Sequence, residues 1–129
     1  MHRSRLSTFV IDCKTGDLDA AAEFWSRALG RPWKMEAEPD PHYRELAASD
    51  GEPKLLLQQV AHESRIHLDI EADDIDAEAT RLEALGAKRI GRVKRWWVME
   101  APTGQRFCIV HPQRGPLEGK GNEWPDGGD

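Results

Sequence analysis

One segment of this chain occurs twice, and that repeat limits the folds open to it. Each copy has a short, mostly apolar run ending in Asp, then an Asp-rich turn, then an amphipathic stretch that closes with Ala-Leu-Gly. The first copy spans residues 9–30 and the second spans residues 66–86, with one residue fewer before the second glycine. Self-similarity of this length indicates a duplicated supersecondary unit. Each copy is typical of a strand, a capped turn, a helix and a glycine stop.

Hydrophobic periodicity extends each copy into a module of strand-helix-strand-strand-strand. In module one (residues 6–60) we expect a helix at 18–29 and strands at 6–13, 33–37, 43–48 and 54–60. In module two (residues 65–112) we expect a helix at 75–85 and strands at 65–71, 87–91, 96–100 and 106–110. This order predicts a single α+β domain, residues 1–112, with a mostly antiparallel sheet and the helices on one face. Residues 113–129 are expected to form a loose Gly/Pro-rich tail, whose Trp124 docks either locally or on a partner.

Composition limits the class of protein. With 129 residues, 39% hydrophobic and 32% charged, the chain is typical of one soluble globular domain. A net charge of -5 argues against nucleic acid as a partner. No stretch approaches the length of a membrane span, and no long apolar run follows the basic N-terminus. Two cysteines are too few for a disulfide framework, so we expect a cytoplasmic protein without membrane partners.

The first strand of module two alternates strictly in its chemistry. Ile66, Leu68 and Ile70 fall on one face, where we expect them to provide apolar cover for the helices. Arg65, His67 and Asp69 fall on the other face, which the helices leave open. A cation, an imidazole and a carboxylate in a row are typical of a pocket wall. The alternative is an ordinary surface strand with a His–Asp hydrogen bond.

Asp12 and Cys108 each have two possible interpretations. Asp12 is the repeat partner of Asp69; the two could share a proton inside the fold, or each could anchor a turn or pair with Arg65 or Arg106. Cys108 is either a small core residue or, if His67 lies close, a nucleophile.

Two adjacent tryptophans share one predicted strand, so one of them should pack in the core while the other stacks on a planar ligand. We place Trp97 in the ligand-binding set.

A set of short motifs, in order, resembles one superfamily. They are Val10-Ile11-Asp12-Cys13, Ala22-Glu23-Phe24-Trp25, Ala28-Leu29-Gly30, His67-Leu68-Asp69 and Phe107-Cys108-Ile109. Together they resemble the vicinal oxygen chelate superfamily, and more closely its glyoxalase-like subgroup of actinobacterial type. The resemblance covers residues 6–112. It implies two tandem βαβββ modules that form a half-open mixed β-barrel with the helices on the outer face, and it implies a homodimer.

The resemblance also implies where a metal would bind. Metal-dependent relatives chelate one divalent ion with His, Glu or Gln from the first and last strand of each module. Carried over, these positions fall on His67, Cys108, Val10, and Leu55 or Leu57. Two of the four are apolar, so we expect no metal and no other cofactor, with His67 and Cys108 as the two family-position candidates. The alternative is a divalent ion such as zinc on that pair, helped by Asp12, Asp69 or Gln58.

Two functions follow from these residues. The first, and the one that we expect from the sequence, is a metal-independent small-molecule binding protein of the bleomycin-resistance kind, with a cleft between its modules lined by Asp12, Arg65, Trp97 and Arg106. The second is an enzyme, a lyase, isomerase or hydrolase, acting on a small oxygenated metabolite through His67, Asp69 and Cys108. The apolar Val10 and Leu55 favour the first function, and the clustered Arg65, His67 and Asp69 favour the second.

Overall fold

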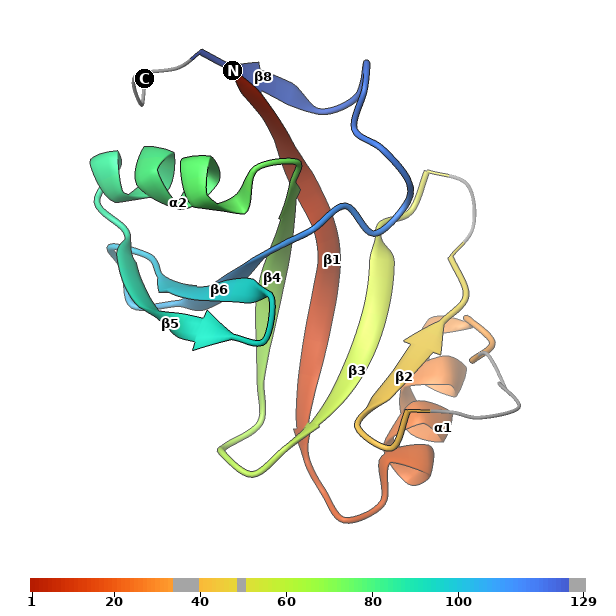
Figure 1. The fold of residues 1–129 in the computed structure, drawn as a ribbon. Coiled ribbons are helices and arrows are strands. Elements are labelled where there is room, and N and C mark those ends of the chain that lie inside the picture. Colours follow the sequence, from red (N-terminus) through yellow and green to blue (C-terminus); the bar gives the residue numbers. More distant parts are fainter. Residues whose placement is uncertain (34–39, 49–50, 126–129) are drawn as a thin grey trace. The chain divides into compact units, whose positions relative to one another are not determined.

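The computed structural model describes residues 1–33, 40–48 and 51–125, and in them the chain forms two helices and a mixed sheet (Figure 1). The elements are β1 (His2–Lys14), α1 (Leu18–Leu29), β2 (Tyr43–Leu46), β3 (Lys54–Val60), β4 (Arg65–Ala72), α2 (Ile75–Ala84), β5 (Lys88–Val93), β6 (Trp96–Glu100), β7 (Arg106–Val110) and β8 (Asn122–Trp124).

Most of these elements lie where the sequence predicted them. Both helices begin at the predicted residue, and β3, β6 and β7 match their predicted ranges. The strand expected at 33–37 is represented by one isolated bridge between Trp33 and Leu46, and residues 34–37 lie outside the described residues. Neither described helix is long and apolar enough to cross a membrane.

The strands follow the order β2-β3-β1-β4-β7-β6-β5, with β8 paired to β1 off this path. Within each repeat the first and last strands are parallel, β1 with β3 and β4 with β7. The β2–β3, β5–β6, β6–β7 and β1–β8 pairs are antiparallel. In the described residues the path ends at β2 and β5, so the sheet is mixed, as predicted, and is not closed into a barrel; its half-open curvature stays a prediction.

The chain divides into two compact units that share β1 and β4. The N-terminal unit is Thr8–His67, and the C-terminal unit combines Met1–Ser7 with Leu68–Asp129. In the N-terminal unit α1 packs on β1 and β3 through a cluster of buried side chains: Ile11, Cys13, Leu18, Ala22, Leu46, Leu55 and Leu57. Asp17 begins the helix by accepting the Ala20 N–H at 3.1 Å, as predicted. Gly30 ends it at φ 67, a left-handed conformation that favours glycine.

In the C-terminal unit α2 covers the end of β4 rather than its length. The buried cluster beneath the helix consists of Ala72, Ile75, Ala79, Met99 and Ile109. Because α2 packs on β4 only near Ala72, at the end of the strand, the side chains of Ile66 and Leu68 are not buried by it. The predicted burial of these two residues is wrong. Ile66 is 63% exposed and Leu68 is 40% exposed.

The tail predicted to be loose is instead folded back between Leu117 and Trp124. Leu117 is buried, and β8 pairs antiparallel with His2, Arg3 and Ser4 at the start of β1. The approach is close enough that a Cβ on Gly121 would lie 2.8 Å from the Ser4 carbonyl oxygen. The sequence missed this strand because its residues are mostly polar and its pairing partner lies at the other end of the chain.

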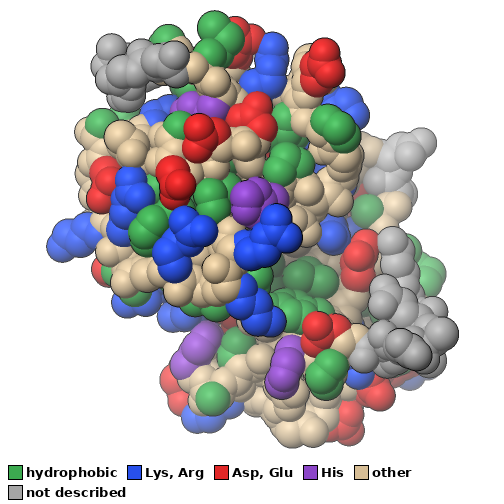
Figure 2. Space-filling view, in the orientation of Figure 1, with side chains coloured by type: hydrophobic (Ala, Val, Ile, Leu, Met, Phe, Trp, Pro, Cys, Tyr) green, Lys and Arg blue, Asp and Glu red, His purple; other side chains and the backbone are tan. Residues whose placement is uncertain are grey.

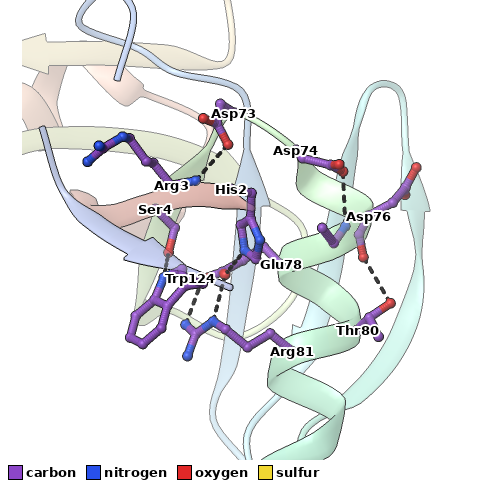
Figure 3. A network of polar contacts seen from close by, with 11 residues as sticks. His2, Arg3, Ser4, Asp73, Asp74, Asp76, Glu78, Thr80, Arg81 and Trp124 are labelled. Atoms are coloured by element: carbon purple, nitrogen blue, oxygen red, sulfur yellow. Dashed lines mark hydrogen bonds and ion pairs between the residues drawn. The ribbon is translucent and has the colours of Figure 1, made fainter. Parts of the chain in front are cut away.

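A buried carboxylate on α2, Glu78, is the centre of a hydrogen-bond network in the C-terminal unit (Figure 3). Glu78 is fully buried and accepts hydrogen bonds from Arg81 Nε at 2.8 Å, Arg81 Nη2 at 2.9 Å and His2 Nε2 at 2.7 Å. The Arg81 guanidinium lies 3.7 Å from the Trp124 ring centroid, and Trp124 Nε1 donates to Ser4 Oγ at 2.8 Å. Burial alone would raise the pKa of Glu78, but hydrogen bonds from Arg81, His2 and Ser4 outweigh it and hold that pKa below its ordinary value. The network ties β1, α2 and β8 together.

Replacing Glu78 by Gln should therefore destabilise the protein by about 3 kcal/mol at neutral pH, because Arg81 and His2 lose their anionic partner. A folded-state pKa below the unfolded value means that the carboxylate stabilises the fold above the unfolded pKa. That contribution is lost as the pH falls through the folded pKa. The free energy of unfolding, measured in urea, should thus differ most between wild type and Glu78→Gln at pH 7. This difference should become smaller below about pH 4.

The matched control is Glu83→Gln in the same helix, where the side chain is 41% exposed and pairs with Arg89 on the surface. This variant should change stability little, since exposed ion pairs contribute little. Equal destabilisation by both variants would show that the Glu78 network does not hold this region.

Candidate functional site

A hydrogen-bonded carboxylate–imidazole pair lies between β1 and β4 of the N-terminal unit. Asp12 is 2% exposed, and His67 Nδ1 donates to Asp12 Oδ2 at 2.8 Å. An ionised carboxylate can only accept, so this bond places the proton of a neutral His67 on Nδ1 and the lone pair on Nε2. The His67 side chain is 11% exposed, which leaves the imidazole within reach of a ligand.

Arg65 extends the pair toward the surface. Its Nε lies 3.5 Å from Asp12 Oδ2, so the predicted pairing of Asp12 with Arg65 is present. Its Nη2 lies 3.3 Å from His62 Nε2, and His62 Nδ1 lies 2.8 Å from the Glu63 carbonyl oxygen. The side chains of His62, Arg65, Asp12 and His67 thus form one continuous line of polar contacts.

Asp69 and Cys108 face each other on neighbouring strands of the C-terminal unit. They are register partners in the parallel β4–β7 pair, and both are half-buried. Because β4 continues without a break from His67 to Asp69, these two residues lie on the same side of the strand. Of the three residues that the sequence proposed as catalytic, Asp69 and Cys108 thus lie side by side in the C-terminal unit, while His67 belongs to the N-terminal unit. A joint site of all three stays a prediction.

The two cysteines differ in their surroundings. Cys13 is buried against α1, where burial first and the neighbouring Asp12 charge second raise the pKa of its thiol. It is the inert core residue that a raised pKa predicts. Cys108 is partly exposed and lies beside Asp69 instead of in the apolar core.

The family's metal positions can now be tested against the donors present. Val10 is buried and pairs with Leu56 across β1 and β3, on the same side of β1 as Asp12. Leu55 and Leu57, which the sequence assigned to this position, pack beneath α1, so that assignment is wrong by one residue. Leu56 is also apolar, however, so two of the four positions still offer no ligand atom. The residues present do not fit the four-donor chelate that the resemblance implied.

The other two residues predicted to bind a ligand lie farther along the C-terminal unit. Trp97 belongs to the α2 side of the sheet, and its Nε1 donates to Asp76 Oδ1 at 2.8 Å. Its ring lies 4.7 Å from the Arg89 guanidinium and 5.1 Å from that of Arg92. Figure 2 shows blue side chains gathered over this β5–β6 hairpin. Arg106 is half-buried on β7, two residues from Cys108 and opposite Glu100 of β6.

Trp97 and Cys108 lie on opposite faces of the sheet. Trp97 pairs with Ile109, which is buried under α2, whereas Cys108 pairs with Val98. A ligand beside Cys108 would thus approach from the face away from Trp97. The role of Trp97 in binding a ligand stays a prediction.

Sequence reasoning missed His62. It lies in the turn between β3 and β4, three residues before Arg65. Only the conformation of this turn brings its imidazole to the guanidinium, and no periodic pattern in the sequence points to it.

Comparison with known proteins identifies the family of this chain. Residues 8–110 match the model of the glyoxalase-like domain. The chain belongs to this family. No curated protein matches the glyoxalase-like chain at a significant level.

Solved structures support the fold. Methylmalonyl-CoA epimerase from Mycobacterium tuberculosis is similar at 22% identity and a TM-score of 0.58, over 88% of this chain and 90% of that one. A hypothetical protein from Bacillus halodurans C-125 is similar at 15% identity and a TM-score of 0.60, over 88% and 97%. An uncharacterized protein from Methanosarcina mazei is similar at 20% identity and a TM-score of 0.55, over 88% and 98%. At these identities the likeness concerns the fold.

The Asp12–His67 bond makes a direct spectroscopic prediction. In wild-type protein at mildly alkaline pH, ¹⁵N chemical shifts should show His67 with its proton on Nδ1, because Asp12 accepts it there. Asp12→Asn should lower the population of this tautomer, since the amide can also present a donor. His42, an exposed histidine of the same unit, should keep its signals unchanged in the variant. A wild-type His67 that carries its proton on Nε2 would contradict the assignment.

Proposed function

We propose that this glyoxalase-like protein is an enzyme of the lyase or isomerase type that moves a proton on a small oxygenated molecule, with His67 as the base. The Asp12–His67 hydrogen bond carries the proposal. It directs the lone pair at Nε2 and sets a buried carboxylate behind the imidazole. This is the arrangement in which a histidine can take a proton from a substrate and hold the resulting positive charge.

The proton transfer follows from the pair. His67 Nε2 takes a proton from a carbon next to a carbonyl group, and the electron pair of that C–H bond moves toward the carbonyl oxygen. The imidazolium that forms keeps its Nδ1–H bond to Asp12, a buried carboxylate whose negative charge stabilises it. The same Nε2–H then returns the proton to the substrate at the same or a neighbouring atom. The catalytic roles of Asp69 and Cys108, which belong to the C-terminal unit, stay predictions from the sequence.

The second candidate is the metal-independent binding protein. One observation favours it: Val10 and Leu56 place apolar side chains at two of the positions where relatives hold a metal. A site without that metal can bind a ligand without turning it over. The homodimer, the cytoplasmic location, the actinobacterial subgroup and the absence of nucleic-acid and membrane partners stay predictions from the sequence.

Proton exchange tests the enzymatic proposal. The protein would be incubated in D2O with small carbonyl compounds, both 2-oxo acids and hydroxyketones, while the loss of the protons next to the carbonyl is followed by ¹H NMR. Wild-type protein should accelerate this exchange, and His67→Ala should lose about 10²-fold or more of the acceleration while still binding the compound.

The matched control is His42→Ala, which removes another imidazole from the same unit and should leave exchange unchanged. Exchange that survives in His67→Ala would remove His67 from the reaction. Saturable binding with no exchange in wild-type protein would favour the binding protein.

Metal content tests the donor set. We expect no stoichiometric ion after dialysis against Ni, Co, Mn, Fe or Zn, measured by elemental mass spectrometry, because Val10 and Leu56 supply no ligand atoms. A variant with Val10→His and Leu56→Glu is the positive control, since it restores four donors. One ion per wild-type chain that is lost in His67→Ala would mean that His67 is a metal ligand in spite of the apolar Val10 and Leu56.

A further inference from the structure

The guanidinium of Arg65 is held in place by two contacts, which use only some of its N–H donors. Its Nε faces Asp12 Oδ2 at 3.5 Å and its Nη2 faces His62 Nε2 at 3.3 Å. Among the described residues Nη1 has no hydrogen-bond partner, and the side chain is 46% exposed. An arginine has five N–H donors in a rigid plane, so this one still presents donors to solvent two residues from His67.

His62 fixes that orientation from the other side. A guanidinium has no acceptor atom, so His62 Nε2 must accept the Arg65 hydrogen bond with its lone pair. Its proton is then on Nδ1, which donates to the Glu63 carbonyl oxygen at 2.8 Å. Both contacts of the imidazole therefore require the same neutral tautomer. This agreement indicates that His62 positions Arg65 and is not simply its neighbour.

The charges around Arg65 select the kind of anion. Asp12 faces the guanidinium, and the neighbouring Lys14 is paired with Glu63 at 2.8 Å. Each nearby cation thus already has one carboxylate partner. A dianionic phosphate would need more positive charge than this, whereas a single carboxylate needs one planar donor fork.

We propose that the substrate carries a carboxylate, which Arg65 binds while His62 holds the guanidinium in place and His67 takes a proton from the carbon on the far side of the adjoining carbonyl group. This inference rests on the proposed function and adds to it the chemical class of the substrate, a small 2-oxo acid. Asp12 links the two halves of the site, because its Oδ2 atom faces both Arg65 and His67. His62 is a positioning residue, since it acts through Arg65.

Matched ligands separate the carboxylate from the rest of the molecule. The probes are acetate and 2-oxobutyrate, their neutral amides acetamide and 2-oxobutanamide, and inorganic phosphate. Binding to ¹⁵N-labelled full-length protein would be followed by chemical-shift changes. We expect the acids to bind about 10-fold or more tightly than their amides, with the Arg65 side-chain signal shifting on titration. Arg65→Gln should abolish this preference and leave amide binding unchanged.

The role of His62 has its own readout. His62→Leu should raise KM for proton exchange of 2-oxobutyrate with a smaller change in kcat, because binding is weakened while His67 is intact. His62→Gln should recover much of the loss, since its amide oxygen can accept the Arg65 hydrogen bond. Arg27→Gln is the control, because Arg27 lies on α1 and is 82% exposed, away from this line of contacts.

The outcomes distinguish this inference from the proposed function. Proton exchange that depends on His67 but is equal for 2-oxobutyrate and its amide would overturn the carboxylate assignment and leave the enzyme standing. A preference for acids that Arg65→Gln removes, in a protein without proton exchange, would support the carboxylate site and defeat the enzyme. Phosphate that binds more tightly than acetate would overturn the choice of a carboxylate.

Discussion

The candidate site depends on one buried carboxylate. Asp12 is almost wholly removed from water, so its charge must be matched by groups nearby. His67 donates to it and Arg65 faces it, and both come from the adjoining β4. A carboxylate in this setting acts on its partners in a specific way. It selects the tautomer of the histidine and sets the position of the guanidinium, two properties that water would leave undefined.

The same strand carries a second polar anchor at its other end. His2 and Ser4 at the start of β1 belong to the Glu78 network of the C-terminal unit. Asp12 lies farther along β1, in the N-terminal unit, and its position depends on how β1 and β4 are aligned there. A slip by one residue would turn Asp12 away from His67 and replace it with Ile11 or Cys13. Residues from both ends of the chain, His2 and Ser4 on β1 and Trp124 on β8, meet at this network in the C-terminal unit.

The glyoxalase-like fold leaves the chemistry to a few side chains. In this chain the donors expected of a metal chelate are partly replaced by Val10 and Leu56, while an Asp–His pair and an arginine lie beside the place where the metal would be held. Proton transfer by a base and recognition of an anion are the chemistry that such residues can perform. The proposed enzyme and its proposed carboxylate substrate follow from these residues and not from the name of the family.

The sequence alone determined the repeated modules, both helices and most strands, because periodicity and capping residues such as Asp17 act locally. It also determined that His67 and Asp69 share one face of β4, since strand alternation requires it. It did not show that Leu56 rather than Leu55 faces the site, that β8 returns to β1, or that Ile66 and Leu68 stay exposed. Those features depend on register and on the reach of α2, which long-range packing decides. The hydrogen bonds of His67 to Asp12 and of Arg65 to His62 likewise arose only in the tertiary structure, because each depends on how a strand or turn is placed beside another.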